Sequence, residues 1–385
     1  MDVARARIVL VHDWLTGMRG GEKCLEVLCR RWPDARLYTL LHKSGSVGPV
    51  IGSQRIVTSF LQRLPHVDRY YRYLLPLMPA AAAGWRLPAC DLVVSLSHCV
   101  AKSARIPRNA RHVCYCFTPM RYAWHQQHAY FRGQGLARIK AQLADRILER
   151  LRQWDRETAK GVDHFLAISK TVQQRISECY ARPSEVIYPP VATNFYTPAA
   201  LPREDFYLVV SALAPYKRVD LALEACRRLG KQLVVIGTGQ DAARLCRLGA
   251  GNVHWLGWQS NEQIRDALRR CRALLFPGEE DFGIVPVEAQ ACGAPVIAFG
   301  RGGATETVLP LGQRREPTGI WFAEQTTESV VEAIERFERH RSDFSPQAAR
   351  RQALLFQESR FEDELFGYLE TVLQPSATKA ERQAA

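Results

Sequence analysis

The apolar residues of this chain occur in short continuous runs that alternate with amphipathic stretches, a pattern that predicts strands connected by helices. Two clear runs, Ala273–Phe276 and Pro295–Phe299, have the character of strands buried on both faces. Between them, Pro286 suits the first turn of a helix and Gly293 suits its left-handed end. This stretch therefore predicts a strand, a loop, a helix and a second strand.

The same pattern recurs along the rest of the chain. A basic amphipathic stretch at residues 135–160 has apolar residues four positions apart and predicts a long helix. Alternating strands and helices in both halves indicate an α/β fold with parallel sheets. Since 385 residues exceed what one core usually supports, we expect two domains. Further strands are predicted at Arg7–Val11, Asp91–Leu96, His112–Phe117, His164–Ile168, Phe206–Val210 and Lys231–Ile236.

Breaks in this pattern predict the domain boundaries. A weakly patterned, proline-containing segment at residues 191–205 predicts a linker between a first domain, 1–190, and a second domain, 206–345. Because proline is well tolerated in the first turn of a helix, Pro346 predicts a C-terminal helix over residues 346–375. We expect residues 376–385 to form a disordered tail.

The composition limits the class of protein. A hydrophobic fraction of 47% with 24% charged residues is typical of a soluble globular protein. The apolar runs are too short to span a bilayer, and the N-terminus has no cleavable leader, so we expect a cytoplasmic protein. The chain has 11 cysteines without a C-x-x-C pair, which argues against a disulfide framework and against a zinc site.

The charge of the chain is unevenly distributed. Residues 1–200 contain 29 basic and 14 acidic residues, an excess of 15, whereas residues 201–385 contain 23 basic and 25 acidic residues. A basic surface of this kind attracts anionic lipid, phosphorylated intermediates or nucleic acid. Within it, Arg63, Arg69 and Arg72 stand among aromatic and apolar residues. That segment fits either a membrane surface or a packed helix with a solvated basic face.

Candidate chemistry concentrates in the loop after Phe276, because ligands of α/β sheets gather at the carboxyl ends of strands. Glu280 lies in that loop, and Glu288 lies about one turn into the following helix. Carboxylates accept hydrogen bonds from sugar or ribose hydroxyls, while a helix N-terminus favours phosphate. Together these groups indicate a sugar nucleotide, although two isolated glutamates also fit an ordinary acidic surface.

Three other loops are candidates for binding phosphate. Gly20 and Gly21 precede a helix, where their lack of side chains lets backbone amides approach a diphosphate. Lys217 and Arg218 lie between a predicted strand and the helix that follows it. The turn beginning at Gly237 fits the dinucleotide pattern G-x-G-x-x-A, but no acidic partner is convincingly placed downstream, which disfavours a dehydrogenase.

Longer motifs resemble the family 4 glycosyltransferases. Their donor-site signature is similar to the segment from Glu280 through Phe282-Gly283-Ile284 and Glu288, followed by a second glycine pair before Glu306. The segment ending in Thr118-Pro-Met-Arg-Tyr-Ala-Trp resembles a branch of bacterial mannosyltransferases of polysaccharide and lipopolysaccharide assembly. Two positions depart from the family. Phe117 replaces a histidine of that branch, and Ala212 replaces an arginine of many members.

The resemblance implies a GT-B fold, α/β with two Rossmann-like domains facing across a cleft, and transfer of a sugar with retention. The family pattern assigns Lys217 to the donor diphosphate and Glu280 to the transferred sugar, and these are the expected catalytic residues. Glu288 is assigned to the ribose. The remaining donor-binding residues implied are Gly20, Gly21, Arg218, Gly237, Phe282, Gly283 and Ile284.

The resemblance also implies the partners. GDP-mannose is the first expected donor, with UDP-sugars left open, and the acceptor is expected to be a lipid-linked or polysaccharide precursor. We expect His98, Arg63, Arg69 and Arg72 to serve the acceptor or an anionic membrane, at the cytoplasmic face of the inner membrane. Because no D-x-D motif appears, neither a metal nor another cofactor is expected.

Two other classes of function stay open. Phe117 and Ala212 are also consistent with a catalytically impaired protein that binds a nucleotide-sugar. A sugar-nucleotide epimerase of the same architecture would convert the donor without an acceptor. The impaired protein could bind nucleic acid in place of a nucleotide-sugar, whereas the expected transferase has no nucleic acid as a partner.

Overall fold

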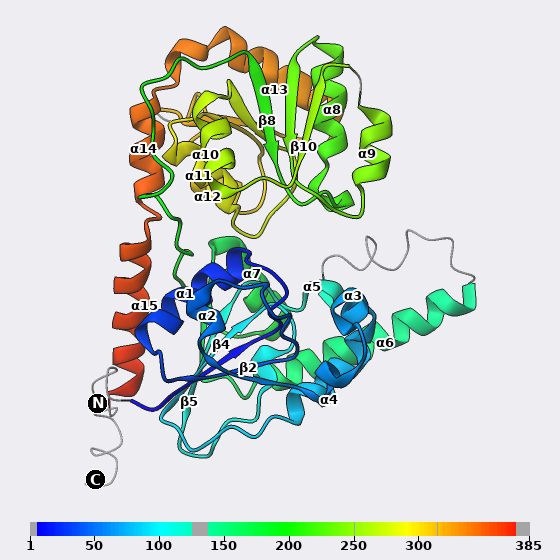
Figure 1. Ribbon diagram of the computed structural model, residues 1–385, viewed down its shortest axis with the longest axis vertical. Helices are drawn as coiled ribbons and strands as arrows, with labels where there is room; N and C mark the ends of the chain where they lie inside the picture. The colour runs from blue at the N-terminus through cyan, green and yellow to red at the C-terminus, as the bar shows by residue number, and fades with distance from the viewer. Residues whose placement is uncertain (1–5, 125–137, 250, 314, 375–385) are drawn as a thin grey trace. The chain divides into compact units, whose positions relative to one another are not determined.

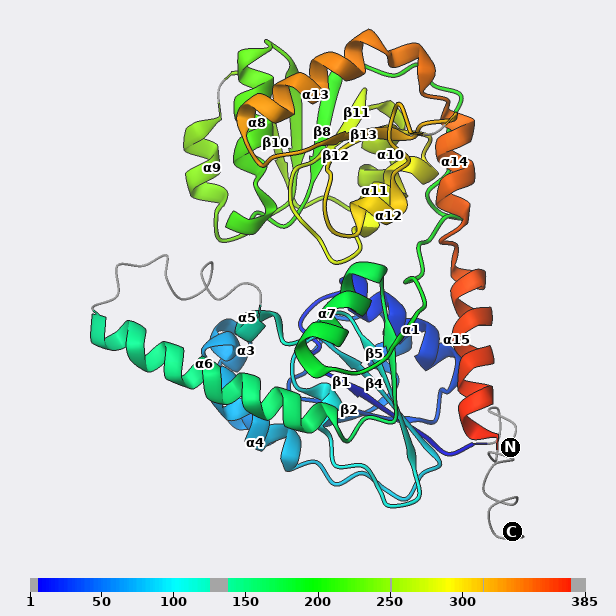
Figure 2. The ribbon, with the colours of Figure 1, turned by 180° about the vertical axis from the view of Figure 1, so that it is seen from behind.

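The computed structural model describes residues 6–124, 138–249, 251–313 and 315–374, without the side chains of residues 122 and 138–144. The chain divides into two compact units. The first combines residues 1–189 with 361–385, and the second comprises residues 190–360. Each contains one parallel sheet with helices on both of its faces (Figures 1 and 2).

The first unit has a seven-stranded sheet in the order β3-β2-β1-β4-β5-β6-β7, with every pair parallel. The central strands β1 and β4 are buried along their whole length, as their continuous apolar sequences predict. The strands are β1 (Ile8–His12), β2 (Arg36–Thr39), β3 (Arg55–Thr58), β4 (Leu92–Ser97), β5 (Arg111–Cys116), β6 (His164–Ala167) and β7 (Glu185–Val186).

The helices of this unit cover the two faces of the sheet. One face packs against Met78 of α4 and against Leu148 and Leu151 of α6. On the other, the rings of Tyr115 in β5 and Phe361 in α15 are 5.7 Å apart. The helices are α1 (Gly20–Arg31), α2 (Pro49–Gly52), α3 (Val67–Tyr70), α4 (Met78–Ala83), α5 (Arg121–Trp124), α6 (Arg138–Ala159), α7 (Lys170–Tyr180) and α15 (Glu358–Leu373).

A buried ion pair holds α6 against the sheet. The Lys102 ammonium lies 2.5 Å from one carboxylate oxygen of Asp155, and both side chains are almost fully buried. The second oxygen accepts hydrogen bonds from the Trp124 indole at 2.9 Å and from the Tyr180 hydroxyl at 2.8 Å. A buried ion pair is tolerated when its remaining bonding positions are filled in this way.

The second unit repeats the arrangement with six parallel strands in the order β10-β9-β8-β11-β12-β13. The strands are β8 (Phe206–Val210), β9 (Gln232–Ile236), β10 (Val253–Gly257), β11 (Ala273–Phe276), β12 (Val296–Phe299) and β13 (Gly319–Phe322). The helices are α8 (Val219–Arg228), α9 (Ala242–Leu248), α10 (Asn261–Arg270), α11 (Ile284–Ala291), α12 (Ala304–Thr307), α13 (Thr327–Arg339) and α14 (Pro346–Leu354).

Both sheets reverse their strand order at the centre, between β1 and β4 in the first unit and between β8 and β11 in the second. The loops that leave the two strands at such a point run in opposite directions and open a crevice at their carboxyl ends. The loop after β8 contains Lys217, and the loop after β11 contains Glu280. In the first unit the corresponding loops contain Asp13 and His98.

Two segments differ from the sequence prediction. Residues 191–205, expected as a linker, are part of the second unit because their polar backbone is bonded to it. Arg269 of α10, for example, donates to the carbonyl of Thr197 at 2.7 Å. The expected C-terminal helix is two helices, of which α14 stays with the second unit and α15 enters the first after residue 360. The expected tail, 376–385, lies outside the described residues.

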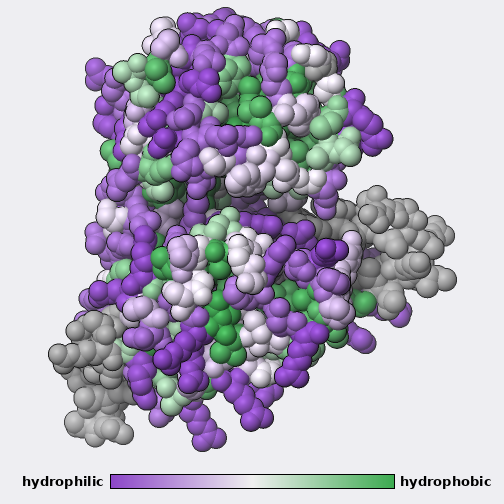
Figure 3. All heavy atoms as spheres, viewed as in Figure 1, coloured by the Kyte–Doolittle hydropathy of each residue, from purple (hydrophilic) through white to green (hydrophobic). Residues whose placement is uncertain are grey.

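Apolar side chains gather in these two cores. In the second unit, Val209, Ala222 and Ile334 belong to one buried cluster that joins the sheet to α8 and α13. Figure 3 shows one face of the molecule, where hydrophilic side chains cover most of the surface and hydrophobic ones emerge in small groups. No helix among the described residues is long and apolar enough to cross a bilayer.

A buried histidine makes the stability of the first unit dependent on pH. Burial lowers the pKa of His112 from 6.5 to about 4, and the ring is 2.8 Å from the Ser95 hydroxyl. The folded pKa lies below the unfolded one, so as pH falls below about 6.5 the unfolded chain takes up a proton first. The free energy of unfolding should therefore fall by up to about 1.4 kcal/mol per pH unit towards pH 4.

Denaturant unfolding of wild type and His112→Gln at pH 7, 6 and 5 measures this contribution. When the free energy of unfolding is plotted against pH, the two proteins should show the same slope above pH 6.5. Below pH 6.5 the wild type should lose more stability than the variant. Parallel pH profiles would contradict the assignment.

Candidate functional site

In the second unit, the loops at the strand-order reversal bring together the two residues that the sequence predicts as catalytic. The Lys217 ammonium forms an ion pair with the Glu280 carboxylate. The side chains are 18% and 13% exposed, so the pair is largely screened from solvent yet open on one side. Lys217 comes from the short turn after β8 and Glu280 from the loop after β11.

Glycines let these loops approach closely enough to form the pair. A Cβ added at Gly278 would lie 3.0 Å from the Cα of Lys217. A Cβ at Gly302 would lie 2.4 Å from the carbonyl oxygen of Glu280, and the amide of Gly303 donates to that oxygen at 2.8 Å. Because any side chain at Gly302 would collide with this backbone, the position of Glu280 depends on glycine there.

Arg218 follows Lys217 in a left-handed conformation, with φ of 51°, and α8 begins at the next residue. Its guanidinium is bonded to the Asp220 carboxylate at 3.3 Å, and the two side chains are about one-third exposed. The basic group therefore lies at the same loop as Lys217 and carries a partner of its own.

The turn at Gly237 serves the packing of a neighbouring loop. A Cβ at Gly237 would lie 1.8 Å from the carbonyl oxygen of Ser211, and one at Gly239 would lie 2.1 Å from that of Leu213. The amide of Leu213 donates to the carbonyl of Thr238 at 2.9 Å. This contact explains why both positions are glycine without reference to a ligand.

The segment Phe282–Ile284 forms the entry to α11. Gly283 precedes the helix with φ of 83°, a conformation that favours glycine, and Ile284 is its first residue. Phe282 is buried, with its ring 5.5 Å from that of Phe356. Its backbone adjoins Gly303, where a Cβ would lie 2.2 Å from the Cα of Phe282.

Glu288 lies on α11 and is only 4% exposed. Burial and the adjacent Glu288 carboxylate both raise the pKa of the Tyr196 hydroxyl, which is hydrogen-bonded to Glu288. A buried carboxylate needs such a donor. The Arg350 guanidinium holds this region together by donating to the carbonyls of Thr193, Tyr196 and Ala291 at 2.7 to 3.2 Å.

In the first unit, the reversal of strand order is organised by Asp13. This fully buried carboxylate accepts four backbone N–H bonds, at 2.7 to 2.9 Å, from the turn that follows β4. It also lies 3.1 Å from Nδ1 of His98. Burial lowers the pKa of His98, although the negative charge of Asp13 opposes that shift. The imidazole is 26% exposed, so a neutral, oriented ring reaches the surface here.

Gly20 and Gly21 are the first residues of α1 at the same end of the sheet. A Cβ at Gly21 would lie 3.1 Å from the ring of Phe117 and 3.4 Å from that of His12. Phe117 also lies 6.3 Å from His98, measured between ring centroids. The structure therefore brings His98, Gly20 and Gly21 together around Phe117. Two other histidines lie near Phe117 in the sequence. Of these, His112 is buried in the sheet, and His125 lies outside the described residues.

Arg63, Arg69 and Arg72 lie on the short helices between β3 and β4, and all three are exposed. Large apolar side chains of the same segment are exposed beside them in the sequence. We call residues 60–77 the basic apolar segment. Its exposed apolar side chains are Phe60 at 49%, Leu64 at 37%, Tyr73 at 84% and Leu77 at 47%.

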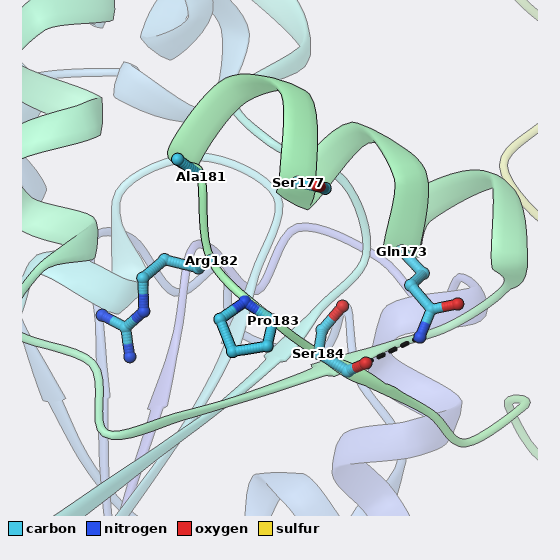
Figure 4. A pocket seen from close by; sticks show the side chains of 6 residues that line it. All are labelled: Gln173, Ser177, Ala181, Arg182, Pro183 and Ser184. Carbon is cyan, nitrogen blue, oxygen red and sulfur yellow. Dashed lines mark hydrogen bonds between the residues drawn. The ribbon is translucent and has the colours of Figure 1, made fainter.

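A cavity of about 550 Å³ elsewhere in the first unit contains none of the predicted residues (Figure 4). Two of its polar side chains are bonded to the backbone. Gln173 donates to the carbonyl of Ser184 at 2.6 Å, and Arg182 donates to the carbonyls of Ala159 and Val162. The Ser184 hydroxyl is buried without a hydrogen-bond partner among the described residues.

The described residues contain no cluster of three or more histidine, cysteine or carboxylate side chains that could hold a metal ion. Ten of the eleven cysteines are buried and Cys246 is exposed, and no disulfide joins any two of them in the part of the chain that the structure describes.

Comparison with known proteins bears on the second unit. Residues 197–353 match the family model described as glycosyl transferases, group 1. The match contains the whole Lys217–Glu280 site and α11. It does not extend to the first unit, so the likeness to this family is limited to residues 197–353, which we call the glycosyltransferase region.

Two curated relatives resemble part of this chain. A D-inositol 3-phosphate glycosyltransferase of Mycobacteroides abscessus is 31% identical over 172 residues, which cover 39% of this chain and 38% of the relative. A GDP-mannose-dependent monoacylated alpha-(1-6)-phosphatidylinositol monomannoside mannosyltransferase of Corynebacterium glutamicum is 35% identical over 116 residues, covering 26% and 30%. The chain thus matches well under half the length of each relative.

Solved structures agree with the fold over nearly the whole chain. HepE of Anabaena, solved in complex with UDP, has a TM-score of 0.66 at 15% identity and covers 95% of this chain and 100% of its own. Sucrose-phosphate synthase of Thermosynechococcus elongatus has a TM-score of 0.72 at 16% identity, covering 95% and 99%. The predicted fold class, α/β with two Rossmann-like units of the GT-B type, is confirmed.

The sequence analysis did not single out Asp13 or Tyr196. Asp13 had a usable signal, because it is a charged residue directly after a buried strand, at the edge where ligands and caps gather. Tyr196 had none, since its contact with Glu288 joins residues far apart in the chain.

Replacing Asp13 by Asn should destabilise the first unit. Asparagine has one acceptor oxygen in place of two, so at least one buried N–H loses its partner and the charge is lost. We expect unfolding free energy to fall by about 3 kcal/mol or more. Because Asp13 raises the pKa of His98, that pKa should also fall further, which NMR titration measures.

Asp68→Asn is the matched control. Asp68 forms a part-exposed ion pair with Lys43 at 3.3 Å, and its loss should cost no more than about 1 kcal/mol. An equal loss in the two variants would contradict the organising role of Asp13.

Proposed function

We propose that the protein is a glycosyltransferase that takes a sugar from a nucleoside diphosphate sugar. The observation that carries this proposal is the Lys217–Glu280 pair at the strand-order reversal of the glycosyltransferase region. A cation and a carboxylate held together at that edge suit a ligand with both a diphosphate and sugar hydroxyls. Retention of anomeric configuration is part of the proposal and rests on the motif resemblance.

In this proposal Lys217 and Arg218 neutralise the diphosphate, Glu280 accepts hydrogen bonds from the sugar hydroxyls, and Glu288 accepts them from the ribose. During transfer the bond from the sugar C1 to the diphosphate oxygen breaks, and a bond from C1 to the acceptor oxygen forms. The acceptor proton passes to the leaving diphosphate. The charge that develops there is stabilised by Lys217, Arg218 and backbone amides, with no metal ion assigned.

Mannose from GDP-mannose is the donor that we propose first. The Corynebacterium glutamicum relative is described as GDP-mannose-dependent, and it is 35% identical to this chain over 116 residues. UDP-sugars are the second candidates, because HepE was solved with UDP and with UDP-glucose. In the first unit, Gly20 and Gly21 are proposed as donor residues and His98 as an acceptor residue; in the second unit, Gly237 would border the nucleotide.

The proposed acceptor is a lipid-linked saccharide or a polysaccharide precursor at an anionic membrane. The support comes from the basic apolar segment, where exposed Phe60, Tyr73 and Leu77 accompany Arg63, Arg69 and Arg72. Apolar side chains insert at the acyl boundary, and each arginine near an anionic surface adds about 1 kcal/mol of attraction. The protein would act as a peripheral enzyme at the cytoplasmic face of the inner membrane.

A second candidate function is nucleotide-sugar binding without turnover. It is favoured by the position of Phe117, which presents an apolar ring among His12, His98 and Gly21 at the ligand-binding edge of the first sheet. This protein would bind the donor and would transfer nothing. An epimerase would convert the donor alone.

Thermal unfolding with added nucleotides tests the donor. At a hundredfold excess over the dissociation constant, a ligand of the folded state adds about 2.7 kcal/mol to its stability. We expect GDP and GDP-mannose to raise the melting temperature of wild type without added metal. Lys217→Met should remove the effect, because the diphosphate loses its closest cation. Stabilisation by UDP compounds alone would change the assigned donor from GDP-mannose to a UDP-sugar. No response to any of these ligands would contradict the proposal.

Vesicle sedimentation tests the membrane. Changing Arg63, Arg69 and Arg72 to Gln should reduce binding to vesicles containing phosphatidylglycerol by at least tenfold. Added salt should also weaken vesicle binding by the wild type, because it screens the same charges. The matched control changes three exposed basic residues outside the segment, Arg227, Arg247 and Arg336, and should bind as wild type apart from a small effect of net charge. Equal vesicle binding by the two triple variants would contradict the assignment of the basic apolar segment as the membrane-binding surface.

A further inference from the structure

The ammonium that would hold the diphosphate is already bound by a carboxylate of the protein. We propose that Glu280 is an internal counter-ion that competes with the product nucleoside diphosphate for Lys217 and thereby promotes product release. This role is additional to any contact of Glu280 with the sugar. It rests on the proposed function of the site.

The geometry makes the competition strong. Both side chains are more than four-fifths buried, and a partly buried ion pair is screened less by water and salt than a surface pair. Lys217 also extends over the ring of Tyr216, with Nζ 5.3 Å from the ring centroid, which further limits where the ammonium can move. A phosphate that approaches Lys217 must share it with, or displace, the Glu280 carboxylate.

The carboxylate is also fixed in place. The backbone carbonyl of Glu280 is bonded to the Gly303 amide, and Gly302 packs directly against it. On the other side, Gly278 packs against the backbone of Lys217. The backbones of the two loops are thus held in contact from both sides, which keeps the opposite charges at short range. The pair between Arg218 and Asp220 is different, because its side chains are about one-third exposed and separated by only one residue.

This arrangement treats substrate and product differently. When the donor binds, Lys217 interacts with the diphosphate as well as with Glu280, so its ion pair with Glu280 is weakened. The hydroxyls of the donor sugar donate hydrogen bonds to Glu280 and compensate for this loss. After the C1–oxygen bond of the donor breaks and the sugar leaves on the acceptor, those bonds are lost. Glu280 then returns fully to Lys217, and the diphosphate loses part of its binding energy. Glu280 therefore weakens nucleoside diphosphate binding relative to nucleotide-sugar binding.

Isothermal titration with GDP and UDP tests this directly. Glu280→Gln keeps the shape of the side chain and removes its charge. We expect the variant to bind whichever nucleoside diphosphate the wild type binds at least about tenfold more tightly, while transfer falls. A residue that contacts only the sugar would leave diphosphate affinity unchanged. Unchanged or weaker binding by Glu280→Gln therefore overturns the inference.

Two controls separate this effect from others. Glu279→Gln makes the same charge change at the adjacent, exposed residue and should alter diphosphate affinity less than twofold. In the Lys217→Met background, Glu280→Gln should give no gain, because the competition requires the lysine. A gain that persists without Lys217 overturns the inference as well. If neither wild type nor any variant binds a nucleoside diphosphate, the proposed function itself fails.

Discussion

The reversal of strand order at the centre of each sheet is the constraint on which the rest of the structure depends. Parallel strands need crossover connections, and the first strand of each unit has a later strand on either side, β2 and β4 beside β1 and β9 and β11 beside β8. The two central loops must separate, and the crevice that they leave exposes backbone groups and charges. In the second unit that crevice contains Lys217 and Glu280, and in the first it contains Asp13 and His98.

Two buried carboxylates of the first unit, Asp13 and Asp155, have their bonding positions filled. Asp13 caps four amides, and Asp155 accepts from Lys102, Trp124 and Tyr180. Such carboxylates define one arrangement of the loops, because any other arrangement leaves a charge unpaired. Lys217 and Glu280 form a pair that is open to solvent on one side, which suits groups that exchange partners.

Much of the fold was accessible from the sequence, because continuous apolar runs mark buried parallel strands. The strands β1, β4, β5, β6, β8, β9, β11 and β12 correspond to predicted strands, whereas β2, β3, β7, β10 and β13 were missed. Of the missed strands, β3 and β10 are edge strands whose residues alternate between exposed and half-buried positions, so they lack a continuous apolar run. Within the site, local patterns predicted Lys217 and Glu280. They could not predict that the two side chains meet, nor that Gly237 and Gly239 serve loop packing, since these contacts join distant segments.

The return of the last helix has a consequence for how the chain is made. Phe361, Leu365 and Leu369 of α15 are fully buried in the first unit, although they are synthesised after the whole of the second. During translation the apolar surface that α15 covers in the first unit therefore stays uncovered while residues 190–360 emerge and can fold. The first unit, which begins the chain, is therefore completed last. The second unit is an insertion in the sequence of the first, and it can fold before the first unit has all of its residues.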